Sequence, residues 1–367
     1  MRAFLLVIAC HLGATALAAD EVINFYWAGA GEDVATAGGG SWDRDSSAVW
    51  ADSAPGGPLV KWTDHRAAIF AGSSGGTVKI AGSVTAAALK FAATAGPFVI
   101  SCAGNIEFTG EGIACNSWGG QELNLEQTML TFSNAASAGA GARGGLVAIR
   151  SDGLINFTDS ATAGRGMLVS RGEMHFAKKS SAANSAIVNT GILIFEDDAT
   201  SAAAALTNQG ILNLEGRVHD FAGTAFANLL GGVIDLSSVE ADGVAFGSLT
   251  NAAGGAVLVG TKQLTVGSLN LAEGNDLNFD WAAGGGGLIR VTTSMLGNAR
   301  AGGTRVAVNN PGGWVAGQSL PLLDWSAAGS VLGVQLGDFQ LQPLANGFAG
   351  TLSLRDARLI LTVRAIR

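Results

Sequence analysis

The densest cluster of side chains able to do acid–base chemistry is Glu196, Asp197 and Asp198. A glycosidase needs two convergent carboxylates, one acting as an acid and the other as a nucleophile or base. Carboxylates are also the oxygen ligands that Ca²⁺ prefers. The cluster directly follows Phe195, however, at a place where other segments of similar sequence also turn, as at Asp159. We therefore interpret it as a solvated turn rather than as a catalytic site.

Other patterns that bind a metal or a cofactor are missing from the sequence. His65, His175 and His219 are widely separated. The sequence contains no Gly-x-Ser-x-Gly elbow, no His-Glu-x-x-His helix and no P-loop, and no Cys/His spacing suggests zinc. The sequence therefore predicts a protein that is not an enzyme and that has no cofactor.

Tryptophans are concentrated near the N-terminus, at Trp27, Trp42, Trp50 and Trp62. Two interpretations are open. Trp42 and Trp50 can form a platform that contacts glycans, or the four rings can plug the exposed end of a repeat array, which must be covered to prevent edge-to-edge association.

The N-terminal segment has the pattern of a signal peptide. Arg2 is a short positive region, an apolar run extends from Ala3 to Leu17, and Ala16-Leu17-Ala18 is a small-x-small cleavage pattern. The run is shorter than the roughly 20 apolar residues of a membrane span. We expect residues 1–18 to be cleaved, and no later stretch is long and apolar enough to cross a bilayer as a helix.

Cys102 and Cys115 are the cysteines that remain after cleavage. In an oxidising compartment an even pair usually forms a disulfide, which would contribute about 3 kcal/mol to stability on the chain-entropy model. The alternative is a pair of buried free thiols in neighbouring strands. We expect the disulfide.

The elements that must position these side chains repeat along the chain. Gly153, Gly172, Gly191 and Gly210 recur at one constant interval, and looser copies begin at Gly232 and Gly255. Side chains alternate across a strand, so the second and fourth residues after each glycine share a face. All twelve are apolar: Ile155/Phe157, Met174/Phe176, Leu193/Phe195, Leu212/Leu214, Ile234/Leu236 and Val257/Val259.

A small polar residue stands two positions before four of these glycines, at Ser151, Ser170, Asn189 and Asn208. If the repeats stack as coils, these residues form a polar ladder that satisfies backbone groups of the turn. The glycine provides either an unusual backbone conformation or room for a close turn.

This pattern predicts an all-β fold, a parallel β-solenoid (β-helix) with about 19-residue coils and a cap at each end. A β-propeller needs blades of about 40 residues. We expect a signal peptide (1–18), a Trp-rich N-terminal cap (19–75), the β-solenoid (76–270) and a C-terminal β-rich module or cap (271–367).

Composition excludes two classes of protein. The chain has 54 glycines in 367 residues, 14% charged residues and a formal net charge of −8. The low charge and the many aliphatic residues argue against disorder, and the negative charge argues against binding of nucleic acid.

Several phrases resemble bacterial proteins with autotransporter-associated β-strand repeats. They are Tyr26-Trp27, Gly40-Ser-Trp42, Ala48-Val-Trp50, Ala68-Ile-Phe70, Gly76-Thr-Val-Lys-Ile80, Leu89-Lys-Phe91 and Ala316-Gly-Gln-Ser-Leu-Pro-Leu-Leu-Asp-Trp325. The resemblance covers most of the mature chain and implies a surface or extracellular β-helical protein that resembles an autotransporter passenger. We find no counterpart of the family's C-terminal translocator barrel, and therefore do not expect self-translocation.

Together these observations predict an exported, non-catalytic structural or adhesin-like protein that is located at the cell surface, secreted or periplasmic. The expected partners are glycans or cell-surface components. The alternative is a carbohydrate-binding or polysaccharide-degrading right-handed β-helix protein.

Overall fold

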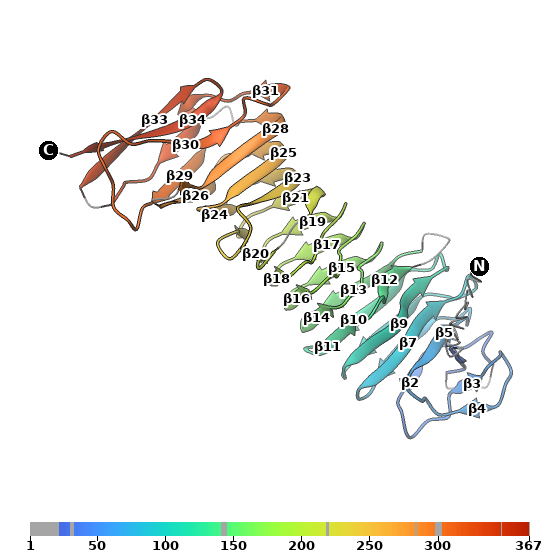
Figure 1. Cartoon of the computed structure of the whole chain (residues 1–367). Coiled ribbons are helices and arrows are strands. Elements are labelled where there is room, and N and C mark those ends of the chain that lie inside the picture. Colours follow the sequence, from blue (N-terminus) through green and yellow to red (C-terminus); the bar gives the residue numbers. More distant parts are fainter. Residues whose placement is uncertain are drawn as a thin grey trace, which may run out of the picture.

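Short alternating apolar and polar segments, separated by tight turns, form strands that stack coil on coil into an elongated rod (Figure 1). The computed structural model describes residues 22–29, 33–140, 145–217, 220–282, 285–297, 303–345 and 347–366. The expected signal peptide (1–18) and His219 lie outside these ranges. The fold is a parallel β-solenoid of about ten turns with a mean spacing of about 22 residues, which confirms the predicted fold class.

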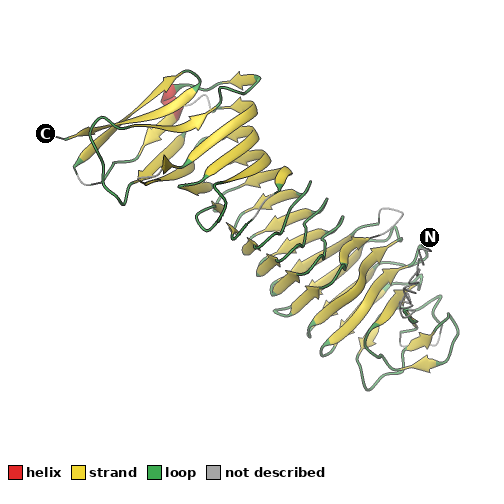
Figure 2. Ribbon diagram, viewed as in Figure 1, coloured by secondary structure: helices red, strands yellow, loops and turns green. Residues whose placement is uncertain are grey.

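Two long sheets run along the rod, and strands cover almost all of its length (Figure 2). The first sheet, called sheet A, contains β1 (Asn24–Trp27), β3 (Trp50–Asp52), β4 (Leu59–Val60), β5 (Arg66–Phe70), β7 (Val84–Phe91), β9 (Ile106–Cys115), β11 (Met129–Phe132), β12 (Ser137–Ala140), β14 (Leu154–Phe157), β16 (Glu173–Phe176), β18 (Ile192–Phe195), β20 (Ile211–Leu214), β22 (Val233–Asp235), β24 (Ala256–Gly260), β26 (Asn275–Ala282), β27 (Gly285–Gly286), β29 (Thr304–Asn309) and β32 (Phe339–Leu341).

The second sheet, sheet B, contains β2 (Gly40–Trp42), β6 (Gly76–Ile80), β8 (Phe98–Cys102), β10 (Gln121–Leu125), β13 (Val147–Ser151), β15 (Met167–Ser170), β17 (Ala186–Asn189), β19 (Ala205–Asn208), β21 (Phe221–Asn228), β23 (Gly243–Asn251), β25 (Gln263–Leu271), β28 (Leu288–Leu296), β30 (Ser319–Asp324), β31 (Ser330–Leu332), β33 (Phe348–Arg355) and β34 (Arg358–Ala365). A short 3-10 helix, η1, spans Leu336–Asp338.

A narrow third side closes the middle coils between the two sheets. It consists of single parallel bridges that join Ser137 to Thr162, Thr162 to Ser181, and Ser181 to Thr200. Each middle coil therefore has a strand in sheet A, a one-residue bridge and a strand in sheet B.

Strand register is regular through these coils. In sheet B, Ile149 pairs with Leu168, which pairs with Ile187, which pairs with Leu206. The same step joins Asn189 to Asn208, which are 19 residues apart, and it confirms the predicted period for this part of the chain. The step is longer elsewhere, for example 29 residues between Asp276 and Arg305, and the added residues lie in turns and longer strands.

The predicted inward positions fill the core. A column of phenylalanine rings runs along the inside of sheet A from Phe108 through Phe132, Phe157 and Phe176 to Phe195, with successive ring centroids 4.6–5.3 Å apart. All five side chains are fully buried. Stacking one coil on the next is what buries them, because a single coil has no second layer to cover its inner face.

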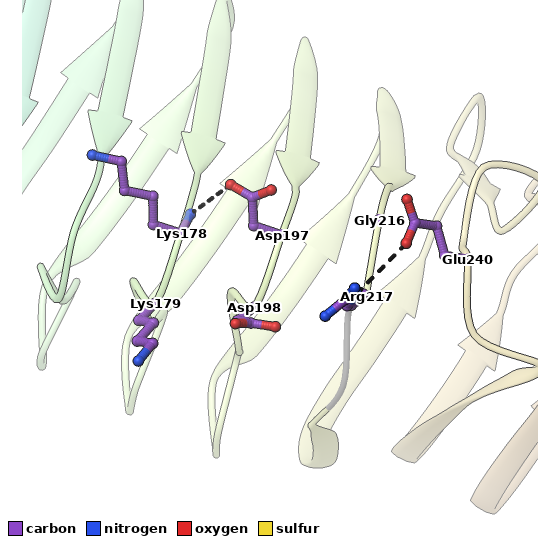
Figure 3. Close-up of a pocket in the computed structure, with 7 residues that line it drawn as sticks. All are labelled: Lys178, Lys179, Asp197, Asp198, Gly216, Arg217 and Glu240. Atoms are coloured by element: carbon purple, nitrogen blue, oxygen red, sulfur yellow. Dashed lines mark hydrogen bonds and ion pairs between the residues drawn. The ribbon is translucent and has the colours of Figure 1, made fainter.

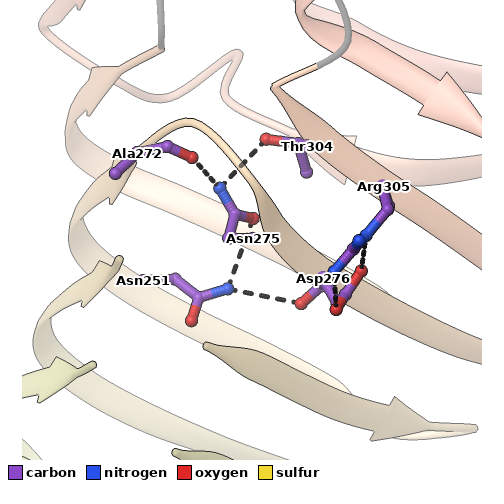
Figure 4. Close-up of polar contacts among 6 residues, drawn as sticks. All are labelled: Asn251, Ala272, Asn275, Asp276, Thr304 and Arg305. Carbon is purple, nitrogen blue, oxygen red and sulfur yellow. Dashed lines mark hydrogen bonds and ion pairs between the residues drawn. The ribbon is translucent and has the colours of Figure 1, made fainter. Parts of the chain in front are cut away.

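The predicted polar ladder forms from Asn189 onward, where sheet B passes into sheet A, and it extends beyond Asn208. Ser151 and Ser170 do not join it, because Ser170 Oγ has no hydrogen-bond partner among the described residues and Ser151 Oγ accepts the N–H of Gly153. Asn189 Nδ2 donates to Asn208 Oδ1 at 2.8 Å, and Asn208 Nδ2 donates to Asn228 Oδ1 at 2.9 Å. The ladder continues through Asn251 to Asn275, whose Nδ2 donates to Thr304 Oγ1 at 3.2 Å (Figure 4). Each of these buried amides also donates to backbone carbonyls, as Asn208 does to Gly210 and Val233.

The repeated glycines provide room rather than an unusual conformation. Gly153, Gly172, Gly191 and Gly210 do not have positive φ. A Cβ on Gly172, Gly191 or Gly210 would collide with the carbonyl oxygen of the preceding glycine in the column. The close approach of adjacent coils at this corner therefore excludes any side chain.

Parallel pairing extends beyond both ends of the predicted solenoid (76–270). At the N-terminal end, β5 pairs with β7 and β2 pairs with β6. At the C-terminal end, β26 pairs with β29 and β28 pairs with β30. The rod ends in an antiparallel hairpin of β33 and β34, so the closing element is shorter than the predicted C-terminal module (271–367).

Candidate functional site

The acidic cluster lies on an outer turn of the solenoid, in a hollow of about 440 Å³ on the surface (Figure 3). The lining residues come from successive coils: Lys178, Lys179, Asp197, Asp198, Gly216, Arg217 and Glu240. Asp159, Lys178 and Asp197 all have left-handed backbone, with φ of 60°, 58° and 56°, and Gly216 occupies the same place in the next coil. The same turn therefore recurs in successive coils, and it carries a charged residue in several of them.

Opposite charges alternate along this turn. Lys178 Nζ lies 2.7 Å from Asp159 Oδ1, and the backbone N–H of Lys178 donates to Asp197 Oδ2 at 3.3 Å. The hydrogen bond from Lys178, with a second from the backbone N–H of Asn134, lowers the pKa of Asp159. One coil further, Arg217 Nε lies 3.8 Å from Glu240 Oε2.

In the hollow and the turn beside it, the carboxylates of Asp159, Asp197 and Glu240 are engaged with cations and backbone groups rather than with one another. The acids are distributed over several coils, and the ion pairs join neighbouring coils. Within the described residues, no group of three or more His, Cys, Asp or Glu side chains is placed to hold a metal ion. The hollow is best described as a row of surface ion pairs.

The structure contradicts the expected role of Trp42 and Trp50 in glycan contact. Their exposed fractions are 1% and 0%. Trp42 packs at 5.0 Å from Trp50 and 4.8 Å from Trp62, measured between ring centroids, and the cluster continues through Phe70 into the first coils. No ring face is left for a sugar, and the cluster closes the end of the hydrophobic core.

The structure also lacks the expected disulfide. Cys102 and Cys115 are free, buried thiols. Cys102 ends β8 in sheet B, whereas Cys115 ends β9 in sheet A. Burial raises the pKa of Cys102 to about 12 and also raises the pKa of Cys115, so both thiols remain protonated at neutral pH and are poor nucleophiles.

His175 belongs to the outer face of sheet A, as the repeat predicted. Its Nε2 lies 2.6 Å from Glu173 Oε1 on the same strand, and both side chains are partly exposed. No third polar group that would orient a catalytic histidine contacts this pair among the described residues. The two side chains contact each other on the outer face of sheet A.

The sequence interpretation missed Trp118. Its side chain is 79% exposed, on the turn between β9 and β10. The signal that singles it out is its position outside the alternating strand pattern, next to Gly119 and Gly120.

No helix among the described residues has the length and apolar character needed to cross a bilayer.

Comparisons with known proteins give a limited result. No protein-family model matches the chain, and no curated protein matches it significantly. The crystal structure of the Haemophilus influenzae Hap adhesin matches 82% of this chain and 40% of that chain, with 11% sequence identity and a TM-score of 0.32. The chain therefore spans less than half of the length of that adhesin, and a similarity this low carries no argument about function. The resemblance to autotransporter-associated repeats stays a prediction.

Proposed function

We propose that this chain is an exported, non-catalytic structural or adhesin-like protein of the bacterial cell surface, in which the solenoid is a stiff spacer. Its proposed partners are glycans or other cell-surface components. The relation to autotransporter passengers is part of this proposal and rests on the phrases quoted from the sequence.

The observation that carries the proposal is the use of the repeated positions by the fold itself. The inward residues fill the core, as Phe157 and Phe176 do, and the buried asparagines from Asn189 onward bond to each other along the rod. The repeated glycines allow the coils to approach. A repeat whose patterned residues all serve stacking supports a mechanical role.

The charged surface supports a non-catalytic role. Lys178 pairs through its ammonium group with Asp159, and its backbone N–H donates to Asp197, so both carboxylates are engaged in contacts between coils. Surface ion pairs of this kind contribute little to stability, and a row of them repeated from coil to coil is what a solvated turn of the solenoid would carry.

Cell fractionation tests export and location. We expect the protein to lack residues 1–18, and we expect an external protease to digest it on intact cells. A matched chain with Ala16→Arg and Ala18→Arg, which disrupts the cleavage pattern, should retain residues 1–18. A wild-type protein found in the cytoplasm with residues 1–18 intact would contradict the proposal.

Incubation with uronate polysaccharides tests the absence of catalysis. We expect no ultraviolet absorbance from unsaturated sugar ends and no new reducing ends. Product formed by the purified protein, and lost in a variant with Glu196→Gln, Asp197→Asn and Asp198→Asn, would show that the chain is an enzyme.

A further inference from the structure

Trp118 is presented to solvent on a turn that is firmly held. All eight tryptophans lie within the described residues, and Trp118 is the one classed as exposed. Ser117 Oγ donates to the carbonyl of Ala95 at 2.6 Å and accepts the backbone N–H of Gly119 at 3.0 Å. Gln121 donates to the carbonyl of Gly96 at 2.9 Å and accepts from the backbone N–H of Phe98. These hydrogen bonds hold the turn on both sides of Trp118, so the turn keeps the ring exposed.

Apolar side chains flank Trp118 in the neighbouring coils. Pro97 is exposed just before β8, and Leu146 is 54% exposed just before β13. Because β8, β10 and β13 are adjacent strands of sheet B, the turns that carry these three residues lie in neighbouring coils, and the three residues are called the apolar strip. Such a strip is far smaller than the roughly 800 Å² per partner that a stable protein interface buries.

The outer face of sheet B carries a row of polar side chains further along the same strands, and Glu122 lies on this face of β10 between Trp118 and Asn124. Strand register aligns Lys79 with Ser101, Ser101 with Asn124, and Asn124 with Arg150. Adjacent members of the row are about 4.8 Å apart, the spacing of neighbouring strands. Lys79 and Arg150 are exposed, and within the described part of the chain neither has an ion-pair partner.

Two amide oxygens in the same coil lack a partner. Asn116 Oδ1, in the turn that carries Trp118, and Asn124 Oδ1, in the polar row, are buried acceptors with no hydrogen bond among the described residues. Buried polar atoms are nearly always satisfied. Both oxygens are also closed to solvent, so a ligand hydroxyl can reach them only when the two side chains turn outward.

We propose that Trp118 and the row Lys79, Ser101, Asn124 and Arg150 form a binding site for a linear acidic polysaccharide. One pyranose ring lies against the indole, because the electron-rich face of the ring attracts the C–H groups of a sugar face. The chain then crosses neighbouring coils, where Ser101 and Asn124 bond to hydroxyls and the two cations bind carboxylates. This inference deepens the proposed adhesin-like function and rests on it.

Fluorescence quenching tests the site directly. In the full-length mature protein, acrylamide should quench Trp118 far more than the buried tryptophans, and polygalacturonate should protect it. Trp118→Ala should weaken polygalacturonate binding about tenfold, the size expected for one aromatic contact. Leu230→Ala is the matched control, because Leu230 is 76% exposed in a different coil, and it should leave binding unchanged.

The charged row has its own test. Lys79→Gln with Arg150→Gln should reduce binding and its dependence on salt, because fewer cations then contact the carboxylates. An uncharged dextran should bind more weakly than polygalacturonate. Trp118→Tyr should bind polygalacturonate more tightly than Trp118→Ala, whereas Trp118→Leu should not. This difference would show that an aromatic face is required.

Three results would overturn the site: no binding of polygalacturonate, equal binding by the Trp118→Ala variant, or protection of Trp118 by rising protein concentration without sugar. The last result would mean that the strip is an interface between copies. Any of these results, found for a protein that is displayed on the cell surface, would overturn this site and leave the proposed structural function intact.

Discussion

The two halves of the solenoid are held together by different chemistry. From Phe108 to Phe195 the core contains a column of stacked rings, whereas from Asn189 to Asn275 it contains a ladder of amides. The two columns overlap in two coils, one with Phe176 and Asn189 and the next with Phe195 and Asn208. A ring column needs only volume and burial, but an amide ladder needs a donor and an acceptor in every coil.

Both columns stay in register even where the number of residues between successive members changes. Phe132 and Phe157 are further apart in the sequence than Phe157 and Phe176, yet the ring planes lie 5° from parallel in the first pair and 2° in the second. The amides of Asn228 and Asn251 bond at 2.9 Å across a spacing of 23 residues. Strand pairing therefore sets the positions of both columns, and the turns absorb the additional residues.

The largest expected effect is a break in the ring column. Phe176→Ala should lower the free energy of unfolding by about 4 kcal/mol, because the ring is fully buried between two parallel rings and its loss leaves a cavity. Phe176→Leu should cost less than about 1.5 kcal/mol, since Leu214 continues the same column two coils later. Urea unfolding followed by circular dichroism measures both, and equal losses would contradict this account of the column.

A substitution in the amide ladder should lower the free energy of unfolding by less, but an apolar side chain should not restore it. Asn208→Ala should cost about 3 kcal/mol, because it leaves Asn189 Nδ2 and Asn228 Oδ1 each without one partner in the core. Asn208→Leu restores apolar volume but supplies neither group, so it should not recover the stability. Recovery by leucine would show that the ladder, like the ring column, depends on volume alone.

Extension of the amide ladder by one residue should raise stability, by less than the losses above. Ser170 is buried and its Oγ has no hydrogen-bond partner within the described residues, although it pairs in sheet B with Asn189. Ser170→Asn should add a bond to Asn189 and raise the free energy of unfolding by about 1 kcal/mol. Ser170→Ala is the control and should change it little. A lower stability for the asparagine variant would show that the first half of the solenoid has no room for an amide.

Acid should lower the stability of the C-terminal end of the rod but not that of the ring column or the amide ladder. Burial by itself raises the pKa of Asp324, but hydrogen bonds from Ser326 and the ion pair with Arg358 outweigh it and lower the pKa. Stability from this group is therefore present above its ordinary pKa of 3.8 and is lost as the pH falls below that value. The loss should be about 1 kcal/mol or less.

Hydrogen exchange at pH 5 and pH 2.5 measures this difference. Amides of β30 and β34 should lose protection in acid, while those of β16 and β19 should keep theirs because the rings and amides of the columns do not titrate. Asp324→Asn should remove the pH dependence at the end of the rod. Equal loss of protection in all four strands would contradict this prediction.

Much of the fold could be predicted because it repeats. The apolar pairs after each glycine, such as Met174 and Phe176, are buried as expected, and Asn189 and Asn208 form the expected ladder. These positions depend on local alternation and on a constant period, and both can be read from the order of residues. Parallel pairing outside 76–270 could not be read from the period, because β5, β26 and β29 pair in the same way without it.

The candidate site was less predictable, because exposure is not a property of a residue type. Trp42, Trp50 and Trp118 are all tryptophans beside small residues, yet two are enclosed by other rings and one faces solvent. Cys102 and Cys115 are close in sequence, but the chain turns between them and places them at the ends of strands in different sheets.

The sequence by itself determined the coil: where its strands lie, which face turns inward and which polar residue recurs at the turn. Those features follow from near neighbours along the chain. Only the tertiary structure decided which tryptophan is exposed, which charges pair and why the glycines cannot carry a side chain. Each of these depends on atoms that lie a whole coil further along the chain and come into contact only when the coils stack.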